Sequence, residues 1–199
     1  MLANDLLTLR QQIERFTPLS DDEWHMLTPH VRVETIQKHQ FFAEAGKQAN
    51  EVALVLEGSF RHFYTTDGDE KTTYFYFEGH FISAYMSCIT QTPSRLTIEA
   101  LSPARYIVFP YTILSALFEK SITWQKFGRL IGEYIALGLE DRMVGLLTQS
   151  PEDRYLALLK SSKKKILDRI PQHYVANYLG ITPVSLSRIR SRIMRRDDV

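Results

Sequence analysis

Hydrophobic residues between positions 31 and 109 come in short runs that are separated by turn signals. The runs cover residues 31–36, 52–56, 60–65, 72–77, 96–100 and 106–109. Runs this short and this regularly spaced predict an antiparallel sandwich, roll or barrel. Asp67-Gly68 is the strongest of the intervening turn signals, because this pair suits the two-residue loop of a β-hairpin.

The hydrophobic pattern has a helical period on both sides of this region. Residues 1–16 are expected to form an amphipathic helix, and Ser20 with Glu23 three residues later predicts a capped second helix. From Tyr111 the period is helical again, and it ends in a stretch of about 25 residues that runs to Leu147, which is long for a helix of a globular protein.

Apolar positions extend around too much of this long helix for a single stripe that faces a core. We therefore expect two copies of the chain to pair through it as a homodimer. The alternative is a helix that is buried between the β-rich region and a C-terminal domain. Ser150 and Pro151 predict the N-cap and the first residue of the helix that follows.

Two short helical patterns on either side of Gly180 predict a helix-turn-helix. Gly180 can supply the left-handed backbone at which the first helix ends. Thr182 can cap the second helix, and Pro183 falls at its first position, where a missing N–H costs nothing. The apolar residues at helical spacing are Val175, Ala176, Leu179, Leu186, Ile189 and Ile193.

The outward face of the second helix is small, hydroxylated and cationic, which suits the major groove of DNA. Arg188 is expected to contact a guanine and Val184 a thymine methyl group, while the remaining residues contact bases or phosphates. The candidate DNA-binding residues are Thr182, Pro183, Val184, Ser185, Ser187, Arg188, Arg190, Ser191 and Arg192, with Lys163, Lys164 and Lys165 as a separate phosphate-binding cluster. The alternative is a solvated cationic helix and a solvated lysine loop.

Charge is divided unevenly along the chain. The formal net charge is +1, yet residues 1–153 carry 13 Lys and Arg against 20 Asp and Glu. Residues 154–196 carry 11 Lys and Arg, with Asp168 as their single acid. An acidic body with a basic end is typical of a nucleic-acid-binding protein.

Other protein classes find little support in the residues. A lone Cys88 excludes an internal disulfide, and no apolar run approaches the ~18 residues of a membrane span, so we expect a cytoplasmic protein with no membrane contact. The six histidines are scattered, and no P-loop, dinucleotide-binding or nucleophile-elbow motif is present. We therefore expect no catalytic residue, no metal and no cofactor. A roll-type metalloenzyme with convergent histidines is the enzymatic alternative.

The order of these elements resembles the Crp/Fnr family of bacterial transcription regulators over nearly the whole chain. The most specific match lies between Val175 and Ile189, and Leu186-Ser187-Arg188-Ile189 is its firmest part. Supporting matches are Glu57-Gly58, Glu78-Gly79-His80-Phe81-Ile82 and Pro151-Glu152-x-Arg154-Tyr155. The resemblance implies a cyclic-nucleotide-binding-like roll, a long helix that pairs two subunits and a recognition helix that reads a palindromic site in double-stranded DNA. RNA polymerase is a candidate further partner.

The chain also departs from the family pattern. Nucleotide-binding members carry a Gly-Glu pair where this chain has Ser83-Ala84, and the arginine of a later pair is shifted by one place to Arg95. A shift by one residue on a strand sends a side chain to the opposite face. We therefore expect no binding of cyclic AMP or cyclic GMP, and the effector is unknown. The candidate effector-pocket residues are Ser83, Ala84, Tyr85, Ser94, Arg95 and Thr97.

The sequence thus predicts an α+β protein. Residues 1–120 are expected to form an antiparallel β-roll sensor of the double-stranded β-helix or jelly-roll type, and residues 121–150 a long connecting and dimerisation helix. Residues 151–199 are expected to form an all-α helix-turn-helix DNA-binding domain with a short or absent wing. The alternative from another class is a small-effector-binding or protein-interaction module with a basic tail and no sequence-specific DNA binding.

Overall fold

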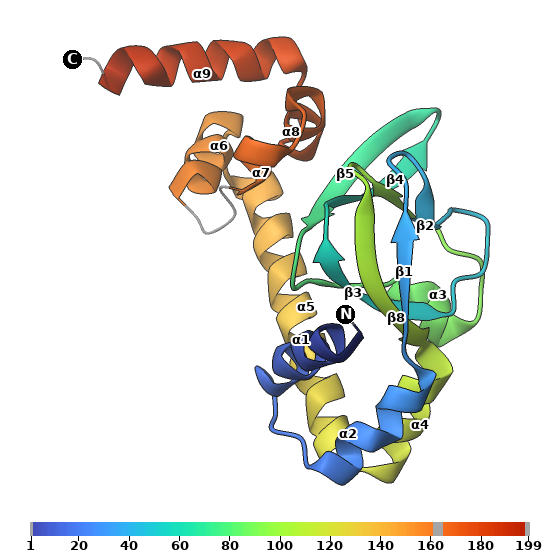
Figure 1. The fold of residues 1–199 in the computed structure, drawn as a ribbon. Helices are drawn as coiled ribbons and strands as arrows, with labels where there is room; N and C mark the ends of the chain where they lie inside the picture. Colours follow the sequence, from blue (N-terminus) through green and yellow to red (C-terminus); the bar gives the residue numbers. More distant parts are fainter. Residues whose placement is uncertain (1, 161–164, 198–199) are drawn as a thin grey trace. The chain divides into compact units, whose positions relative to one another are not determined.

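The computed structural model describes residues 2–160 and 165–197 (Figure 1). The helices are α1 (Leu2–Glu14), α2 (Asp21–Leu27), the 3-10 helix η1 (Thr28–His30), α3 (Tyr85–Thr90), α4 (Tyr111–Lys120), α5 (Ile122–Thr148), α6 (Pro151–Lys160), α7 (Lys165–Arg169), α8 (Gln172–Tyr178) and α9 (Pro183–Asp197). The strands are β1 (Arg32–Ile36), β2 (Phe41–Ala43), β3 (Glu51–Glu57), β4 (Phe60–Thr66), β5 (Asp69–Tyr76), β6 (Phe81–Ile82), β7 (Thr97–Ala100) and β8 (Ala104–Pro110).

These residues divide into two compact units. The first contains residues 2–62 and 75–136, and the second contains residues 63–74 together with the described residues from 137 onward. Most of the β4–β5 hairpin, residues 63–74, thus belongs to the same unit as α6, α7, α8 and α9. The long helix α5 contributes to both units.

The strands form two four-stranded sheets, ordered β1-β8-β3-β6 and β2-β7-β4-β5. This architecture confirms the α+β class with a β-roll, and a strand is present at each of the six predicted runs. The short strands β2 and β6 were not predicted, because three and two residues are too few to show an alternating pattern. Both pair with strands that carry the apolar runs, β7 and β3 respectively.

Two hydrophobic cores lie on the opposite faces of β3 and β8. On β3, Val52 and Leu54 belong to one core, whereas Ala53 and Val55 belong to the other. Successive side chains of a strand point to opposite faces, so a strand that is covered on both sides reads as a continuous apolar run. This is the reason why residues 52–56 carry no polar position.

The first core joins the helices of the N-terminal unit to the roll. It includes Leu9 of α1, Trp24 of α2, Leu117 of α4 and Trp124 of α5, all nearly or fully buried. The second core fills the interior of the roll with large side chains such as Phe60.

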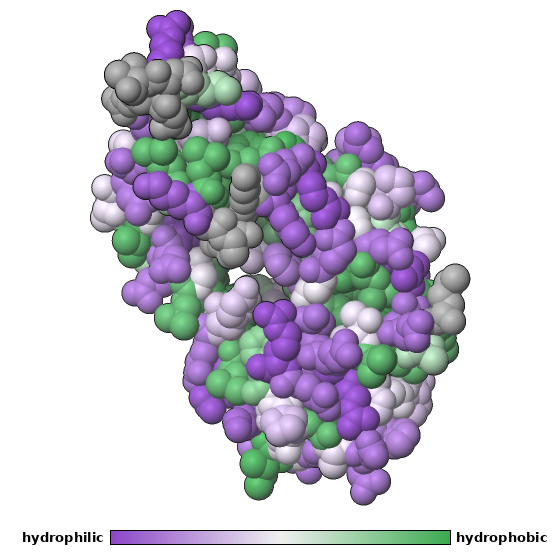
Figure 2. Space-filling view, turned by 60° about the vertical axis from the view of Figure 1, so that its left-hand side comes forward, coloured by the Kyte–Doolittle hydropathy of each residue, from purple (hydrophilic) through white to green (hydrophobic). Residues whose placement is uncertain are grey.

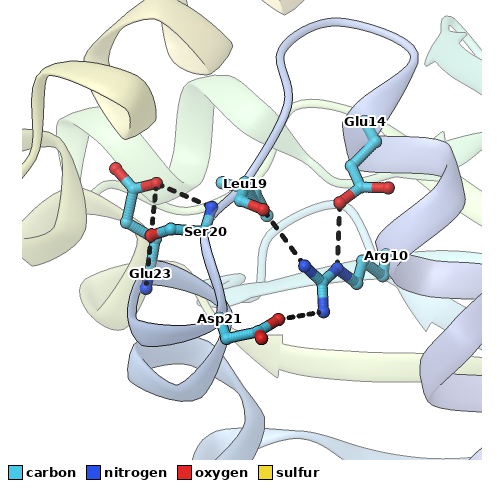
Figure 3. Close-up of polar contacts among 6 residues, drawn as sticks. All are labelled: Arg10, Glu14, Leu19, Ser20, Asp21 and Glu23. Carbon is cyan, nitrogen blue, oxygen red and sulfur yellow. Dashed lines mark hydrogen bonds and ion pairs between the residues drawn. The ribbon is translucent and has the colours of Figure 1, made fainter.

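The connection between α1 and α2 is fixed by polar contacts (Figure 3). The Ser20 hydroxyl accepts a hydrogen bond from the Glu23 amide at 3.3 Å, and the Glu23 carboxylate accepts one from the Ser20 amide at 3.0 Å. This reciprocal pair confirms the predicted capping box. Arg10 of α1 adds contacts to Asp21 at 2.8 Å and to the Leu19 carbonyl at 3.1 Å.

The turn between β4 and β5 is the two-residue loop that the sequence predicts. Asp67 and Gly68 both have positive φ angles, +53° and +83°. This backbone matches the twist of the flanking strands and is readily adopted by an Asp-Gly pair.

The helix α5 confirms the predicted long helix with its 27 residues. Trp124 and Phe127 of its first turns are buried, but most of its second half is exposed. Figure 2 brings the side on which α5 lies forward and shows apolar surface exposed there. In the described residues, no helix combines the length and the apolar character that crossing a membrane requires.

Candidate nucleic-acid interface

The helix-turn-helix is held by apolar side chains that α8 and α9 share. Val175, Ala176 and Leu179 are at most 1 % exposed, and Leu186 of α9 is equally buried at 1 %. Ile189 is also buried, so the spacing that predicted two amphipathic helices corresponds to buried inner faces on both helices. The buried residues therefore define the inner face of α9, and its outer face is the opposite side of the helix.

The turn between α8 and α9 has the geometry that Gly180 makes possible. Gly180 has a φ of +72°, and its amide donates to the Asn177 carbonyl at 3.0 Å. The Ile181 amide donates to the Ala176 carbonyl, also at 3.0 Å. These two bonds form a Schellman motif, which ends a helix with a left-handed residue.

The N-terminus of α9 is capped as the sequence predicts. The Thr182 hydroxyl accepts a hydrogen bond from the Ser185 amide at 3.2 Å, and Pro183 is the first residue of the helix. The Ser185 hydroxyl lies 3.0 Å from the Thr182 hydroxyl. Ser185 is therefore engaged in the cap, and it is half-buried, unlike its neighbours.

The outer face of α9 carries most of the predicted DNA-binding residues. Val184 is 60 % exposed, and Thr182, Pro183 and Ser187 are exposed as well. The cationic part of this face lines one shallow hollow, formed by Ser187, Arg188, Ser191, Arg192 and Arg195. Uncharged and positively charged groups thus share one side of the helix, opposite Leu186 and Ile189.

Three of the predicted cationic residues differ from Arg188 in pairing, burial or position. The Arg192 guanidinium forms an ion pair with the Glu152 carboxylate of α6 at 2.6 Å. Arg190 is half-buried. Lys165 is exposed at the start of α7, whereas the predicted Lys163 and Lys164 lie outside the described residues.

Three further residues hold α8 in place, and sequence reasoning missed their role. Arg142 of α5 and Arg154 of α6 donate to the carbonyls of Tyr178 and Leu179 at the end of α8. The Asn177 side chain donates to the Glu70 carbonyl at 2.8 Å and accepts from the Thr72 amide at 2.6 Å, and both of these residues belong to β5. Arg154 falls in a motif of the family resemblance, but no sequence signal distinguishes Arg142 or Asn177.

The predicted effector-pocket residues are distributed over two environments. Ala84 belongs to the packed core inside the roll, and Tyr85 contacts the Tyr111 ring at 5.9 Å between centroids. Ser83 donates to the Glu51 carbonyl at 3.0 Å. Arg95 is exposed.

The other two predicted pocket residues support the loop between β2 and β3. The Thr97 hydroxyl accepts from the Ala45 amide at 3.2 Å, and the Ser94 carbonyl accepts from the Gly46 amide at 2.7 Å. An open cavity of about 390 Å³ lies beside this loop and is lined by residues between Phe41 and Glu51. None of the six predicted pocket residues lines that cavity.

The metalloenzyme alternative gains nothing from the structure. Within residues 2–160 and 165–197, no three His, Cys, Asp or Glu side chains come close enough together to hold a metal ion. The half-buried His62 packs against the Tyr76 ring, with 6.3 Å between the centroids.

Comparison with known proteins gives a consistent result for both parts of the chain. Residues 33–121 match the model of the cyclic nucleotide-binding domain. The anaerobic regulatory protein of Haemophilus influenzae is 26 % identical over 177 residues, which cover 82 % of this chain and 67 % of that protein. The fumarate and nitrate reduction regulatory protein of Vibrio cholerae is 26 % identical over 178 residues, which cover 83 % and 70 %.

Solved structures share the fold at low sequence identity. FixK2 from Bradyrhizobium japonicum aligns with a TM-score of 0.72 at 16 % identity, covering 84 % of this chain and 86 % of FixK2. The c-di-GMP-responsive global regulator CLP of Xanthomonas campestris aligns with a TM-score of 0.66 at 15 % identity, covering 89 % and 93 %. Both alignments extend beyond the roll, because they cover 84 % and 89 % of this chain, whereas the domain match covers residues 33–121 only. With the helix-turn-helix and the β-roll in place, these matches make the chain similar to regulators of the Crp/Fnr family in sequence and in fold.

Proposed function

We propose that this protein is a Crp/Fnr-type transcription regulator that binds double-stranded DNA as a homodimer, with α9 of each copy in the major groove of one half-site. The observation that carries the proposal is the exposed outer face of α9, on which Ser187, Arg188 and Ser191 are presented to solvent. The inner face of the same helix is anchored in a core through Leu186 and Ile189. A helix of this kind can be inserted into a groove without disturbing the fold.

The exposed residues of α9 have distinct roles in this proposal. Arg188 contacts the O6 and N7 atoms of a guanine, and Val184 contacts a thymine methyl group. Ser187 adds a hydrogen bond to a base or a phosphate. Phosphate contacts come from Thr182, Arg190, Ser191, Arg192 and the lysines 163–165.

Pairing of two copies through α5 completes the proposal. The second half of α5 exposes a set of large apolar side chains: Tyr134, Ile135, Leu137, Leu139, Met143, Val144, Leu146 and Leu147. Their exposure favours a second copy of the chain over a helix buried within one chain, because large exposed apolar surfaces mark interaction sites. An isologous pair of this kind presents two recognition helices to a palindrome.

The roll is proposed to act without binding cyclic AMP or cyclic GMP. The glutamate that would accept from a ribose hydroxyl is replaced by Ala84, which is 1 % exposed in the roll core. The arginine that would neutralise a cyclic phosphate corresponds to the exposed Arg95. Neither of the two polar contacts that such a ligand needs is therefore available.

Selection of bound duplexes from random DNA by the full-length protein tests this function. We expect an enriched palindrome whose half-sites are centred about one helical turn, ~34 Å, apart. Addition of cyclic AMP should leave the affinity unchanged. Recovery of no common sequence, with binding that disappears at moderate salt, would instead favour the interaction module with a basic tail.

A further inference from the structure

The C-terminal end of α8 has an unusual set of hydrogen-bond donors. The last carbonyls of a helix lack partners within the helix and need them elsewhere. In the Schellman motif, backbone amides donate hydrogen bonds to the Ala176 and Asn177 carbonyls. The Leu179 amide donates to the Val175 carbonyl at 2.9 Å. The carbonyls of Tyr178 and Leu179 remain, and each is bound by an arginine from another helix.

Arg142 reaches the Tyr178 carbonyl from α5. Its Nη2 atom donates to that oxygen, and its guanidinium lies 3.8 Å from the centroid of the Tyr178 ring. The Arg142 Nε atom is buried and has no hydrogen-bond partner among the described residues. Burial lowers the pKa of Arg142, and the neighbouring charge of Arg154 lowers it further.

Arg154 joins the same turn to the end of α5. Its Nη2 and Nε atoms donate to the Leu179 carbonyl at 2.8 and 3.2 Å, and its Nη1 atom donates to the Gln149 carbonyl at 2.6 Å. A Cβ atom on Gly180 would lie 3.8 Å from both Arg154 Nη2 and Leu146 Cδ2. The turn of the helix-turn-helix therefore packs directly against α5 and α6.

This arrangement is costly for stability alone. Two like charges are placed close together, and one buried nitrogen is left without a hydrogen bond. Apolar side chains of similar size commonly stabilise a protein as well as or better than buried charges do. Guanidinium groups form directional hydrogen bonds, which apolar groups do not. Their planar donors therefore fix the orientation of the carbonyls that they bind.

We propose that Arg142 and Arg154 are positioning residues that set the angle of α8 and α9 relative to α5. This inference rests on the proposed function, since α5 is there the dimer helix and α9 the reading helix. The angle between them would determine the distance between the two reading helices of a dimer. Arg142 and Arg154 thus determine which half-site spacing the dimer accepts, although neither contacts DNA.

The test compares Arg142→Met with Arg142→Lys in the full-length protein. Methionine keeps the length and the apolar packing but removes every donor, whereas lysine keeps a charge and a donor. Affinity is measured for duplexes in which the two half-sites are moved apart or together by one base pair. For Arg142→Met we expect the preference for one spacing to fall about tenfold, with non-specific DNA binding unchanged. Arg142→Lys should recover part of the preference.

Hydrogen exchange of residues 175–182 provides a readout that needs no DNA. We expect exchange of the Gly180 and Ile181 amides to accelerate about tenfold in Arg142→Met, while the strands of the roll keep their protection. Wild-type exchange together with wild-type spacing preference in Arg142→Met would overturn the proposal. A loss of affinity that is equal for all spacings would also overturn it, because that result describes a merely structural role.

Failure of the proposed function gives a different pattern. If wild-type protein binds no duplex, the DNA readout is lost for every variant, but the exchange readout still decides whether Arg142 holds the turn. Should Arg142→Met fail to fold, Arg142→Lys and Arg154→Lys carry the same two measurements. Unchanged exchange and spacing preference in both lysine variants would then count against the proposal.

Discussion

Arg188 is the residue on which sequence discrimination should depend most. It lies on the exposed face of α9, in the hollow that Ser187 and Ser191 also line. We expect Arg188→Ala to lose about 1–3 kcal/mol of discrimination at one base pair, because a bidentate contact to guanine is removed. Titration of the selected site and of variants with single base changes measures this loss.

Arg95→Ala is the matched control for Arg188→Ala. It removes the same charge from an exposed position of the roll. The control should keep full discrimination. Equal weakening of specific and non-specific binding by Arg188→Ala would show that Arg188 contacts phosphate and does not read a base.

His62 should make the stability of the folded chain depend on pH. Burial lowers the pKa of His62 to about 4, from an ordinary value of 6.5. Between these values the unfolded chain binds a proton that the folded chain does not, so the free energy of unfolding decreases as the pH falls from 6.5 to 4. The loss attributable to His62 is on the order of 3 kcal/mol.

Urea denaturation at several pH values measures this effect. In His62→Gln, the decrease between pH 6.5 and 4 should become shallower by the contribution of His62, whereas His30→Gln, at an exposed histidine, should keep the wild-type slope. Parallel slopes for wild type and His62→Gln would contradict the assignment.

Residues whose role depends on local backbone could be predicted, and residues that act across the fold could not. Gly180 and Thr182 were predicted because a left-handed residue and a helix cap follow from neighbouring positions alone. Arg142 and Asn177 bind backbone groups 36 and 105 positions away, to Tyr178 and Thr72. Sequence reasoning has no signal for such distant partners.

At the scale of elements, the helix-turn-helix depends on the conformation of Gly180. A Cβ atom there would meet only ordinary contacts at 3.8 Å, so the cost of a side chain comes from its φ of +72°. We expect Gly180→Ala to lower the free energy of unfolding by about 1–2 kcal/mol, the cost of a left-handed non-glycine residue. Chemical denaturation monitored by circular dichroism measures the change.

Gly180→Asn serves as the matched variant. Asparagine tolerates the left-handed region better than alanine does. Gly180→Asn should therefore lose clearly less stability than Gly180→Ala. Equal losses for both variants would place the cost in packing against α5 and α6.

The elements that the sequence missed are short or have weak patterns. The helix α3 has six residues, and β2 and β6 are shorter still. Elements of this size are stabilised by their neighbours and not by their own periodicity. The long runs that form β3, β8 and α5 were visible because each of them is buried or apolar over many consecutive positions.

At the scale of the whole molecule, the apolar half of α5 should determine the oligomeric state. Leu147 is 77 % exposed in a single copy, so an aspartate there removes little intramolecular packing. We expect Leu147→Asp to convert the proposed dimer into a folded monomer and to change the unfolding free energy of the monomer by no more than about 0.5 kcal/mol. Sedimentation equilibrium distinguishes the two states.

Ile122→Asp is the control for this variant. Ile122 lies on the same helix and is 84 % exposed, but it is outside the apolar set between Tyr134 and Leu147. The control should remain dimeric. Dimers of unchanged strength in Leu147→Asp would exclude this part of α5 from the interface.

The order of the parts was the easiest large-scale feature to predict, because the hydrophobic period changes along the chain. The assignment of most of the β4–β5 hairpin, residues 63–74, to the C-terminal unit was not predicted. Within that unit, the Asn177 side chain forms hydrogen bonds with the backbone of Glu70 and Thr72. Polar contacts of a side chain with a strand edge leave no trace in a hydrophobic pattern.

The ion pair between Arg192 and Glu152 has a consequence for the energetics of DNA binding. An arginine that already has a carboxylate partner carries an internal counterion, and it must exchange this partner for a phosphate. In the proposed complex, Arg192 would therefore release fewer salt ions from the duplex than an unpaired arginine. The affinity would fall less steeply with salt concentration than the number of cations on α9 suggests.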